Sequence, residues 1–292
     1  MIDFHCHILP GLDDGAATID DSIAMAKVLA DFGYTTVCCT PHCIKGYYDI
    51  TPQKVREATL MLQADLDNAD IRLELWPGME YMLDECFAEF VDDLQPLGDT
   101  RLILCEAPQQ AHPGVVLKSL ELIIDRGYVP LIAHPERTRY FYEMLTKSDA
   151  PEEKCEVLSE TPTGAKENSF LRRLFAPRAS RFVPQRDNVS TVLQKKLPEG
   201  ILFQANFGSF SGFYGEAIQR RAYELLKLGV FSAVASDLHD GGSAETVLIR
   251  DKIENNPLLN KIAEYDGVVT GVNLDNLLKK TLLVKLFSNI QL

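Results

Sequence analysis

The residues best suited to chemistry are histidines and carboxylates that follow short β-rich runs. His5 and His7 form an HxH pair in the run IDFHCH. Side chains two residues apart in a strand point to the same side, so both imidazoles can reach one metal ion. Asp237 and His239 repeat this spacing in SDLH. We therefore interpret both pairs as candidate metal ligands.

Further imidazoles and carboxylates occur where other expected strands end. They are His42 in CTPH, Glu80 in GMEY, Glu106 in LILCE and His134 in LIAHPER, with Asp13 and Asp14 in the loop after HxH. A lone buried histidine is more often a satisfied core residue, and a lone carboxylate is usually a helix cap or a solvated charge. That explanation does not account for the repeated coincidence at strand ends. The remaining histidine, His112, opens an expected helix and is interpreted as a surface or capping residue.

Ligands of this kind predict a particular class of metal chemistry. Imidazole and carboxylate donors suit Mn, Fe, Zn, Co or Mg. The set is too large for one ion, and a carboxylate such as Glu80 can bridge two metals ~3.5–4 Å apart, as in sites that hydrolyse phosphate esters. There the metals generate hydroxide near neutral pH and stabilise the phosphoryl transition state.

Covalent nucleophiles find no support in the sequence. None of the seven cysteines has an arginine six positions later, as the C-x5-R pattern of cysteine-dependent phosphatases requires. A GxSxG elbow and a GxxxxGK[ST] loop are also absent from the sequence. An odd number of cysteines without framework spacing suits reduced thiols. The chemistry is therefore expected to rest on metals.

The elements that must position these residues alternate between strands and helices. We expect strands near 2–5, 34–40, 71–75, 101–105, 129–133, 201–205 and 230–235, with helices such as 20–32 and 114–125 between them. This alternation predicts an α/β fold with a parallel sheet. Closure into a β/α barrel would bring the carboxyl ends of the strands to one mouth, where the distant histidines and carboxylates would meet.

Composition narrows the class of protein. The chain has 292 residues and a net charge of 29 − 42 = −13, which argues against a general nucleic-acid binder. Its first residues lack the basic and apolar regions of a signal peptide, and no stretch approaches the ~18 apolar residues of a membrane span. We expect a single cytoplasmic domain over 1–292.

Two segments interrupt this pattern. The range 141–197 is an insertion, and its part 172–196 holds five Arg and two Lys against one acid. It is either a solvated, partly disordered segment or a basic arm for an anionic partner. The range 273–287 has leucines on one helical face, which would pack against the barrel or form an oligomer contact.

The motifs HCHILPGLDDGA, TPH, GMEY, LILCE, AHPER and SDLH resemble, in this order, those of the PHP (polymerase and histidinol phosphatase) superfamily. Within it, the DDGA, PER and QANFGSFSGFYG runs are most similar to bacterial capsular and exopolysaccharide protein-tyrosine phosphatases. The resemblance covers about 1–140 and 198–245 and implies a distorted TIM-like (β/α)7 barrel.

The resemblance also implies a centre of up to three metals, usually Mn²⁺. Carried over by motif, the ligands would be His5, His7, Glu80 and Asp237 for one metal, Glu80, Glu106 and His134 for the second, and Asp14, His42 and His239 for the third. Arg137 of HPER resembles the arginine that clamps phosphate, a task that suits its planar guanidinium.

This sequence departs from the family pattern at two places. The family usually carries another phosphate-binding arginine shortly after SDxH, where this chain reads DLHDGGSAETVLIR and has Arg250 far along. Arg139 or an arginine of the insertion could substitute. The family often has a basic or histidine residue just after TPH, where this chain has Cys43. Lys45 stands two positions further on, and we also expect it near substrate.

The expected function is metal-dependent hydrolysis of phosphotyrosine on a protein, such as a bacterial tyrosine kinase that regulates capsular or exopolysaccharide synthesis. Arg137 and the metals would hold the phosphoryl group, and His42 or His239 would serve as the acid if one is needed. The alternatives are a small-molecule phosphatase acting on a compound such as histidinol phosphate, another phosphoesterase, or an inactive metal-bound scaffold.

Overall fold

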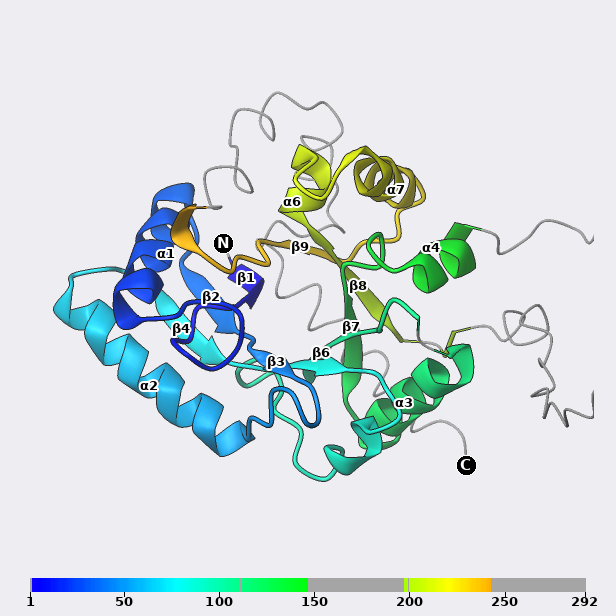
Figure 1. The fold of residues 1–292 in the computed structure, drawn as a ribbon, viewed down its shortest axis with the longest axis horizontal. Coiled ribbons are helices and arrows are strands. Elements are labelled where there is room, and N and C mark those ends of the chain that lie inside the picture. The colour runs from blue at the N-terminus through cyan, green and yellow to red at the C-terminus, as the bar shows by residue number, and fades with distance from the viewer. Residues whose placement is uncertain (1, 111, 147–196, 199, 243–292) are drawn as a thin grey trace, which may run out of the picture.

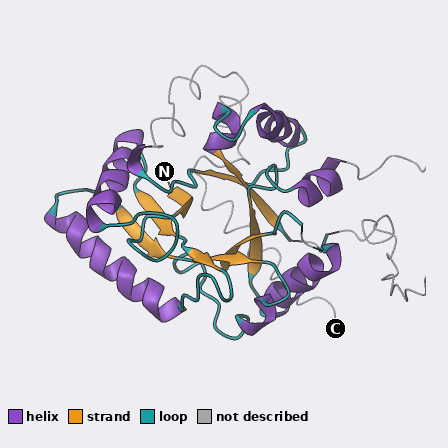
Figure 2. Ribbon diagram, in the orientation of Figure 1, coloured by secondary structure: helices purple, strands orange, loops and turns teal. Residues whose placement is uncertain are grey.

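The computed structural model describes residues 2–110, 112–146, 197–198 and 200–242. Its strands are β1 Ile2–Cys6, β2 Thr36–Cys39, β3 His42–Cys43, β4 Glu74–Pro77, β5 Glu80–Met82, β6 Leu102–Glu106, β7 Val129–Ala133, β8 Leu202–Asn206 and β9 Ala233–Ala235. Its helices are α1 Ile19–Phe32, α2 Pro52–Asn68, the 3₁₀ turn η1 Phe87–Glu89, α3 Pro113–Asp125, α4 Arg139–Thr146, α6 Phe207–Ser211 and α7 Glu216–Lys227. The strands lie inside and the longer helices lie around them (Figures 1 and 2).

The strands form two parallel sheets. One has the order β1-β2-β4 and the other the order β3-β5-β6-β7-β8-β9. The second and third predicted strands, near 34–40 and 71–75, correspond to β2 and β4. After a short break, each is followed by a further strand that was not predicted, β3 and β5 respectively. Pro41 lacks a backbone donor at the first break. At the second, a Cβ on Gly78 would lie 2.6 Å from Cδ2 of Leu97, so the close approach of the chain requires glycine.

The closed barrel expected from the sequence is not found, because the described strands form no single closed sheet. The first and last strands do meet: Asp237 N–H donates to His5 O at 2.8 Å, and Cys6 and Leu238 form an isolated parallel bridge. Ser236 N–H, however, donates to the side chain of Asp3 at 2.9 Å. A side-chain acceptor thus replaces a backbone acceptor at this seam. The α/β architecture with parallel strands is confirmed.

Local sequence explains where the helices begin. Thr18 caps α1 through a reciprocal pair of hydrogen bonds with Asp21, and Gly33 ends the helix in a left-handed conformation with φ of 112°. His112 caps α3 by accepting a hydrogen bond from Gly114 N–H, directly before Pro113. The expectation that His112 is a capping residue is confirmed, as are helices near 20–32 and 114–125.

Strand alternation directs the ends of the strands toward one place. Along β6, Leu102 and Leu104 belong to one apolar cluster while Ile103 and Cys105 belong to another. Glu106 continues the face of Leu102 and Leu104 beyond that cluster. The pleat therefore carries a carboxylate to the carboxyl edge of the sheet.

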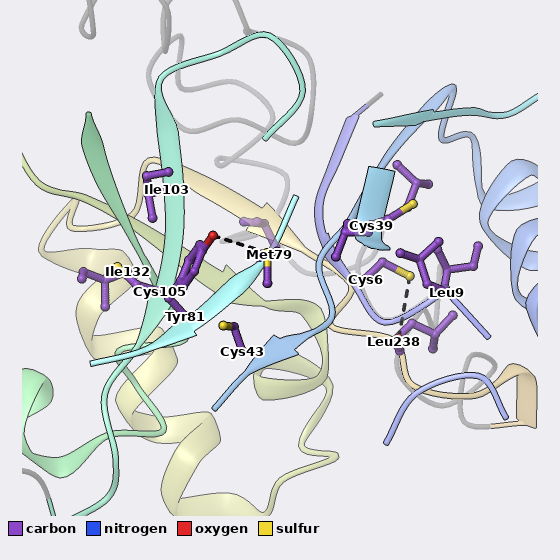
Figure 3. Close-up of a cluster of buried hydrophobic side chains, with 14 of the residues drawn as sticks. Cys6, Leu9, Cys39, Cys43, Met79, Tyr81, Ile103, Cys105, Ile132 and Leu238 are labelled. Carbon is purple, nitrogen blue, oxygen red and sulfur yellow. Dashed lines mark hydrogen bonds between the residues drawn. The ribbon is translucent and has the colours of Figure 1, made fainter. Parts of the chain in front are cut away.

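Buried thiols are part of the apolar core (Figure 3). Cys6, Cys39, Cys43 and Cys105 lie among its aliphatic side chains, and Tyr81 O–H approaches Met79 Sδ at 3.3 Å. Burial raises the pKa of the Cys6 and Cys105 thiols well above the usual range. Such thiols are poor nucleophiles.

Within the ranges described above, no helix has both the length and the apolarity that crossing a bilayer requires. The basic segment 172–196, the closing segment 273–287 and Arg250 lie outside the described residues.

Candidate metal centre

All nine metal ligands expected from the sequence gather at the carboxyl ends of the strands. His5 and His7 come from β1 and its exit, His42 from β3, Glu80 from β5 and Glu106 from β6, while His134 follows β7, Asp237 and His239 follow β9, and Asp14 lies in the loop before α1. Parallel pairing aligns His42 with Glu80. The short strands after the two breaks thus carry these ligands.

Glu80 is the centre of the cluster. Its carboxylate is fully buried, with Oε2 3.1 Å from Nε2 of His5 and 3.0 Å from Nδ1 of His42. Its Oε1 lies 3.2 Å from Nε2 of His134. Burial alone would raise the pKa of Glu80, but the positive charges of His5 and His42 hold it well below the usual value. This carboxylate is therefore ionised and shared between several imidazoles.

The HxH pair faces Asp237. Nε2 of His5 and Nε2 of His7 lie 3.0 Å apart, and Oδ1 of Asp237 is 3.2 Å from the first and 3.3 Å from the second. Three donor atoms of types that bind metals thus converge on one point. The two-residue spacing on β1 has the effect expected from the sequence.

Two further groupings surround His42. Nε2 of His42 lies 3.5 Å from Oδ1 of Asp14, which is also 3.6 Å from Nε2 of His239. Oε1 of Glu106 lies 3.1 Å from Nδ1 of His42. His239 stacks on His7 with ring centroids 3.9 Å apart.

The donor atoms fit divalent metal ions. Four sets in the described chain have ligand atoms within 4.8 Å of one another: His7, Asp14, His42 and His239; His5, His134 and Asp237; His5, His7 and Glu80; and His42, Glu80 and Glu106. Oε2 of Glu80 and Nδ1 of His42 lie 3.0 Å apart, and both are buried without a hydrogen bond. Buried polar atoms normally have partners. Imidazole nitrogens and carboxylate oxygens left in this state suit a metal of the Mn, Fe or Zn type.

Asp13 contacts two of the expected ligands. The sequence placed it among the candidate carboxylates in the loop after HxH but assigned it to no metal. Its Oδ2 accepts hydrogen bonds from Nδ1 of His7 at 2.7 Å and from His42 N–H at 2.9 Å, and its Oδ1 accepts from Gly15 N–H at 3.0 Å. Burial alone would raise the pKa of Asp13, whereas the hydrogen bond from His7 lowers it to about 2. Burial alone would lower the pKa of His7, but its hydrogen bonds with Asp13 and Asp237 raise it to about 10.

Strand β8 and the segment after it supply further support. Oε1 of Gln204 lies 3.1 Å from Nδ1 of His5, which orients the ring of that expected ligand. Nδ2 of Asn206 donates to Oδ2 of Asp237 at 2.5 Å, and Tyr214 O–H donates to the same oxygen at 3.2 Å. The QANFGSFSGFYG run marks this segment in the sequence, but its partners follow only from the fold.

Two ligands adopt unusual backbone conformations. His134 has φ of 33° and Asp237 has φ of 51°, in the left-handed region that non-glycine residues seldom occupy. His134 directly follows β7, and Asp237 lies just beyond β9. Such conformations concentrate at functional sites, where surrounding contacts hold them.

A pocket of 310 Å³ opens over this cluster. It is lined by Asp14, His42, Ile44, Tyr47, Tyr48, Glu106, His134, Arg137, Asp237 and His239. Arg137 is half-buried, with its guanidinium carbon 4.4 Å from the ring centroid of Tyr214. Arg137 is the arginine of the described lining, and its expected role in holding phosphate stays a prediction.

Lys45 and Arg139, the other expected substrate-binding residues, do not line the pocket. Nζ of Lys45 pairs with Glu89 at 2.9 Å, and Nε of Arg139 pairs with Glu143 one helical turn along α4 at 2.6 Å. Both side chains are largely exposed. The structure thus turns them toward local carboxylates and away from the ligand cluster.

Comparison with known proteins identifies relatives of this chain. The family model for capsular polysaccharide synthesis, CpsB/CapC, matches residues 1–155. The tyrosine-protein phosphatase YwqE of Bacillus subtilis (strain 168) is 31% identical over 245 residues, which span 82% of this chain and 78% of that protein. The tyrosine-protein phosphatase CpsB of Streptococcus pneumoniae is 29% identical over 139 residues, 47% of this chain and 57% of that protein.

A solved structure is also similar. It comes from the crystal structures of YwqE from Bacillus subtilis and CpsB from Streptococcus pneumoniae, described as unique metal-dependent tyrosine phosphatases. The match has a TM-score of 0.62 at 27% identity and covers 90% of this chain and 92% of that chain. Together, the matched family model and the extent of the likeness to YwqE show that this chain belongs to the CpsB/CapC family of capsular polysaccharide synthesis proteins.

Proposed function

We propose that this protein is a metal-dependent protein-tyrosine phosphatase. Its substrate would be phosphotyrosine on a bacterial tyrosine kinase that regulates capsular or exopolysaccharide synthesis, in the cytoplasm. The names of YwqE and CpsB as tyrosine-protein phosphatases support the reaction. One structural observation carries the proposal: a buried carboxylate, Glu80, lies among three imidazoles beneath a pocket that also contains Arg137.

We assign the ligands as the family pattern implies. His5, His7, Glu80 and Asp237 would hold one Mn²⁺, Glu80, Glu106 and His134 a second, and Asp14, His42 and His239 a third. Ligand atoms of His5, His7 and Glu80 lie within 4.8 Å of one another, as do those of Asp14, His42 and His239. For the second set, Nε2 of His134 lies 3.2 Å from Oε1 of Glu80 and 3.9 Å from Oε2 of Glu106. These distances support the assignment. When bound, such metals lower the pKa of water and offset negative charge on the phosphoryl group.

The fold that presents these ligands would be a distorted seven-stranded barrel. Counting β2 with β3 and β4 with β5 gives seven parallel strand positions. The hydrogen bond from Asp237 N–H to His5 O joins β1 to the residues after β9, which supports closure of these seven positions into a barrel.

Arg137 would bind the non-bridging phosphoryl oxygens through its planar N–H groups. Asp237 and Tyr214 hold its guanidinium in place before substrate arrives. Water adds to phosphorus, the bond between phosphorus and the tyrosyl oxygen breaks, and inorganic phosphate and tyrosine leave. The departing phenolate has a pKa of about 10, so it needs little help from an acid. His42 and His239 line the pocket and are the nearest candidates for that role.

Elemental analysis together with hydrolysis assays tests this function. Mn-loaded protein should contain two or three metals and release phosphate from a phosphotyrosine peptide, and a chelator should abolish both. The Asp237→Ala variant should lose turnover. Faster hydrolysis of histidinol phosphate than of the peptide would instead identify a small-molecule phosphatase. Bound metal with no turnover on either ester would favour a scaffold.

A further inference from the structure

One wall of the pocket differs chemically from the others. Ile44, Tyr47 and Tyr48 contribute to the lining from a single turn after β3, whereas the remaining lining residues are imidazoles, carboxylates and one guanidinium. A phosphoryl group would be held by the charged residues. The apolar turn must therefore face whatever the phosphate is attached to.

The turn is held in place by its own backbone. Tyr48 N–H donates to Ile44 O at 2.8 Å and Ile44 N–H donates to Tyr48 O at 3.3 Å. Gly46 supplies the left-handed conformation, with φ of 77°, and its N–H donates to Oδ1 of Asp49 at 2.9 Å. The aromatic residues are thus presented by a closed loop.

The two tyrosine rings differ in their surroundings. Tyr48 stacks on His42 with an interplanar angle of 12° and ring centroids 5.9 Å apart. Tyr47 packs its edge against Tyr48 at 4.7 Å and 85°, yet 76% of Tyr47 remains exposed. Tyr48 therefore supports Tyr47, and Tyr47 presents a large unburied aromatic surface at the mouth of the ligand cluster.

We propose that Tyr47, supported by Tyr48 and flanked by Ile44, is an aryl-binding subsite that selects aromatic over alkyl phosphate esters. This inference rests on the proposed phosphatase function. In an aryl phosphate the ring begins one oxygen away from phosphorus, so a phosphoryl group on Arg137 leaves the ring at the pocket wall. Aromatic rings gain from packing against each other beyond the area that they bury.

Non-hydrolysable ligands separate this subsite from turnover. Benzylphosphonate and ethylphosphonate both have a methylene in place of the ester oxygen and differ only in the group beyond it, and titration calorimetry on Mn-loaded full-length protein measures both. Wild-type protein should bind benzylphosphonate more tightly. Tyr47→Ala should weaken benzylphosphonate about three- to tenfold and leave ethylphosphonate unchanged. Tyr47→Phe should retain the wild-type preference, because it keeps the ring.

Leu60→Ala is the matched control, since Leu60 is 72% exposed on α2 and does not line the pocket. Equal affinity of the wild type for both phosphonates would overturn the subsite, and so would equal loss of both ligands in Tyr47→Ala. A preference for benzylphosphonate without hydrolysis of phosphotyrosine would overturn the proposed function alone. With a phosphotyrosine peptide, Tyr47→Ala should raise KM and leave kcat unchanged.

Discussion

Nη1 of Arg137 donates a hydrogen bond of 2.7 Å to Oδ2 of Asp237, while Oδ1 of the same carboxylate faces His5 and His7. One side chain thus connects the proposed phosphate-binding cation to the HxH pair. Burial alone would raise the pKa of Asp237, but the positive charge of His5 and the hydrogen bond with His7 hold it well below the usual value.

Replacing Asp237 with Asn should therefore weaken both metal binding and phosphate binding. The amide removes the charge that pairs with Arg137 and faces the two imidazoles. We expect loss of at least one metal per chain by elemental analysis and a decrease of about 100-fold or more in kcat/KM for a phosphotyrosine peptide. Asp92→Asn, at a carboxylate 93% exposed, is the control. Wild-type metal content in Asp237→Asn would argue against a ligand role.

Tyr214 should act as a positioning residue for Arg137. Its ring lies under the guanidinium and packs against Gly208, where a Cβ would come within 2.9 Å of the ring. Tyr214→Ala should raise both the KM for peptide and the inhibition constant for inorganic phosphate about three- to tenfold. Tyr214→Phe keeps the ring and should recover most of this loss. If Phe and Ala behave alike, the hydroxyl that donates to Asp237 is what matters.

Arg137 and Arg139 offer a direct comparison of two arginines close in sequence. Arg137→Ala should reduce kcat/KM about 100-fold, since it removes a donor aimed into the pocket. Arg139→Ala and Lys45→Ala should change kcat/KM less than about twofold, because both cations are exposed and pair with carboxylates outside the lining. Steady-state kinetics on one phosphotyrosine peptide measures all three. A large effect of Arg139→Ala would restore its expected role at the phosphate.

The adjacent acids Asp13 and Asp14 should separate stability from metal binding. Asp13→Ala leaves the backbone donors of His42 and Gly15 without their acceptor. We expect the free energy of unfolding of chelated protein to fall by about 1–3 kcal/mol in urea titrations. Asp14 is 55% exposed, so Asp14→Ala should change that quantity little but lower the metal content. Similar stabilities for the two variants would contradict the buried role of Asp13.

The stability of metal-free protein should decrease with alkaline pH. The folded-state pKa of His7 is raised from 6.5 to about 10, so its contribution is complete below pH 6.5 and is lost as the pH rises through 10. The folded-state pKa of Asp13 is lowered from 3.8 to about 2, so its contribution is present above pH 3.8 and is lost as the pH falls through 2. Chelated protein should therefore show its highest Tm between pH 3.8 and pH 6.5, where both contributions are complete.

Metal binding should strengthen as the pH rises, whereas the stability of metal-free protein falls. Metals require deprotonated imidazoles, so binding must release the protons that His7 and His42 hold. The rise in Tm on adding Mn²⁺ should grow from pH 6 to pH 8. Calorimetry in buffers of different ionisation enthalpy should detect the released protons. A Tm increase that does not change with pH would show that these histidines are not ligands.

The gathering of the histidines and carboxylates was predictable because strand geometry is local. Two-residue spacing puts His5 and His7 on one side of a strand, and the carboxyl ends of parallel strands share an edge. The helices near 20–32 and 114–125 were predictable for the same reason, since capping and periodicity act over a few residues. Whether the sheet closes was not predictable from local sequence, because the hydrogen bond from Ser236 to Asp3 joins residues at opposite ends of the described chain.

The amino-acid sequence by itself determined the parallel α/β class, the family and the histidines and carboxylates of the cluster, because these depend on residue type, spacing and strand order. Only the tertiary structure decided which acid of the Asp13–Asp14 pair is buried against His7 and that Tyr214 lies under Arg137. It also decided that Lys45 and Arg139 pair elsewhere. Tyr214 and Lys45 contact residues far from them in sequence, which local propensity does not encode. The pair of Arg139 with Glu143 spans a single turn of α4, and only the fold decides that this turn lies outside the pocket lining.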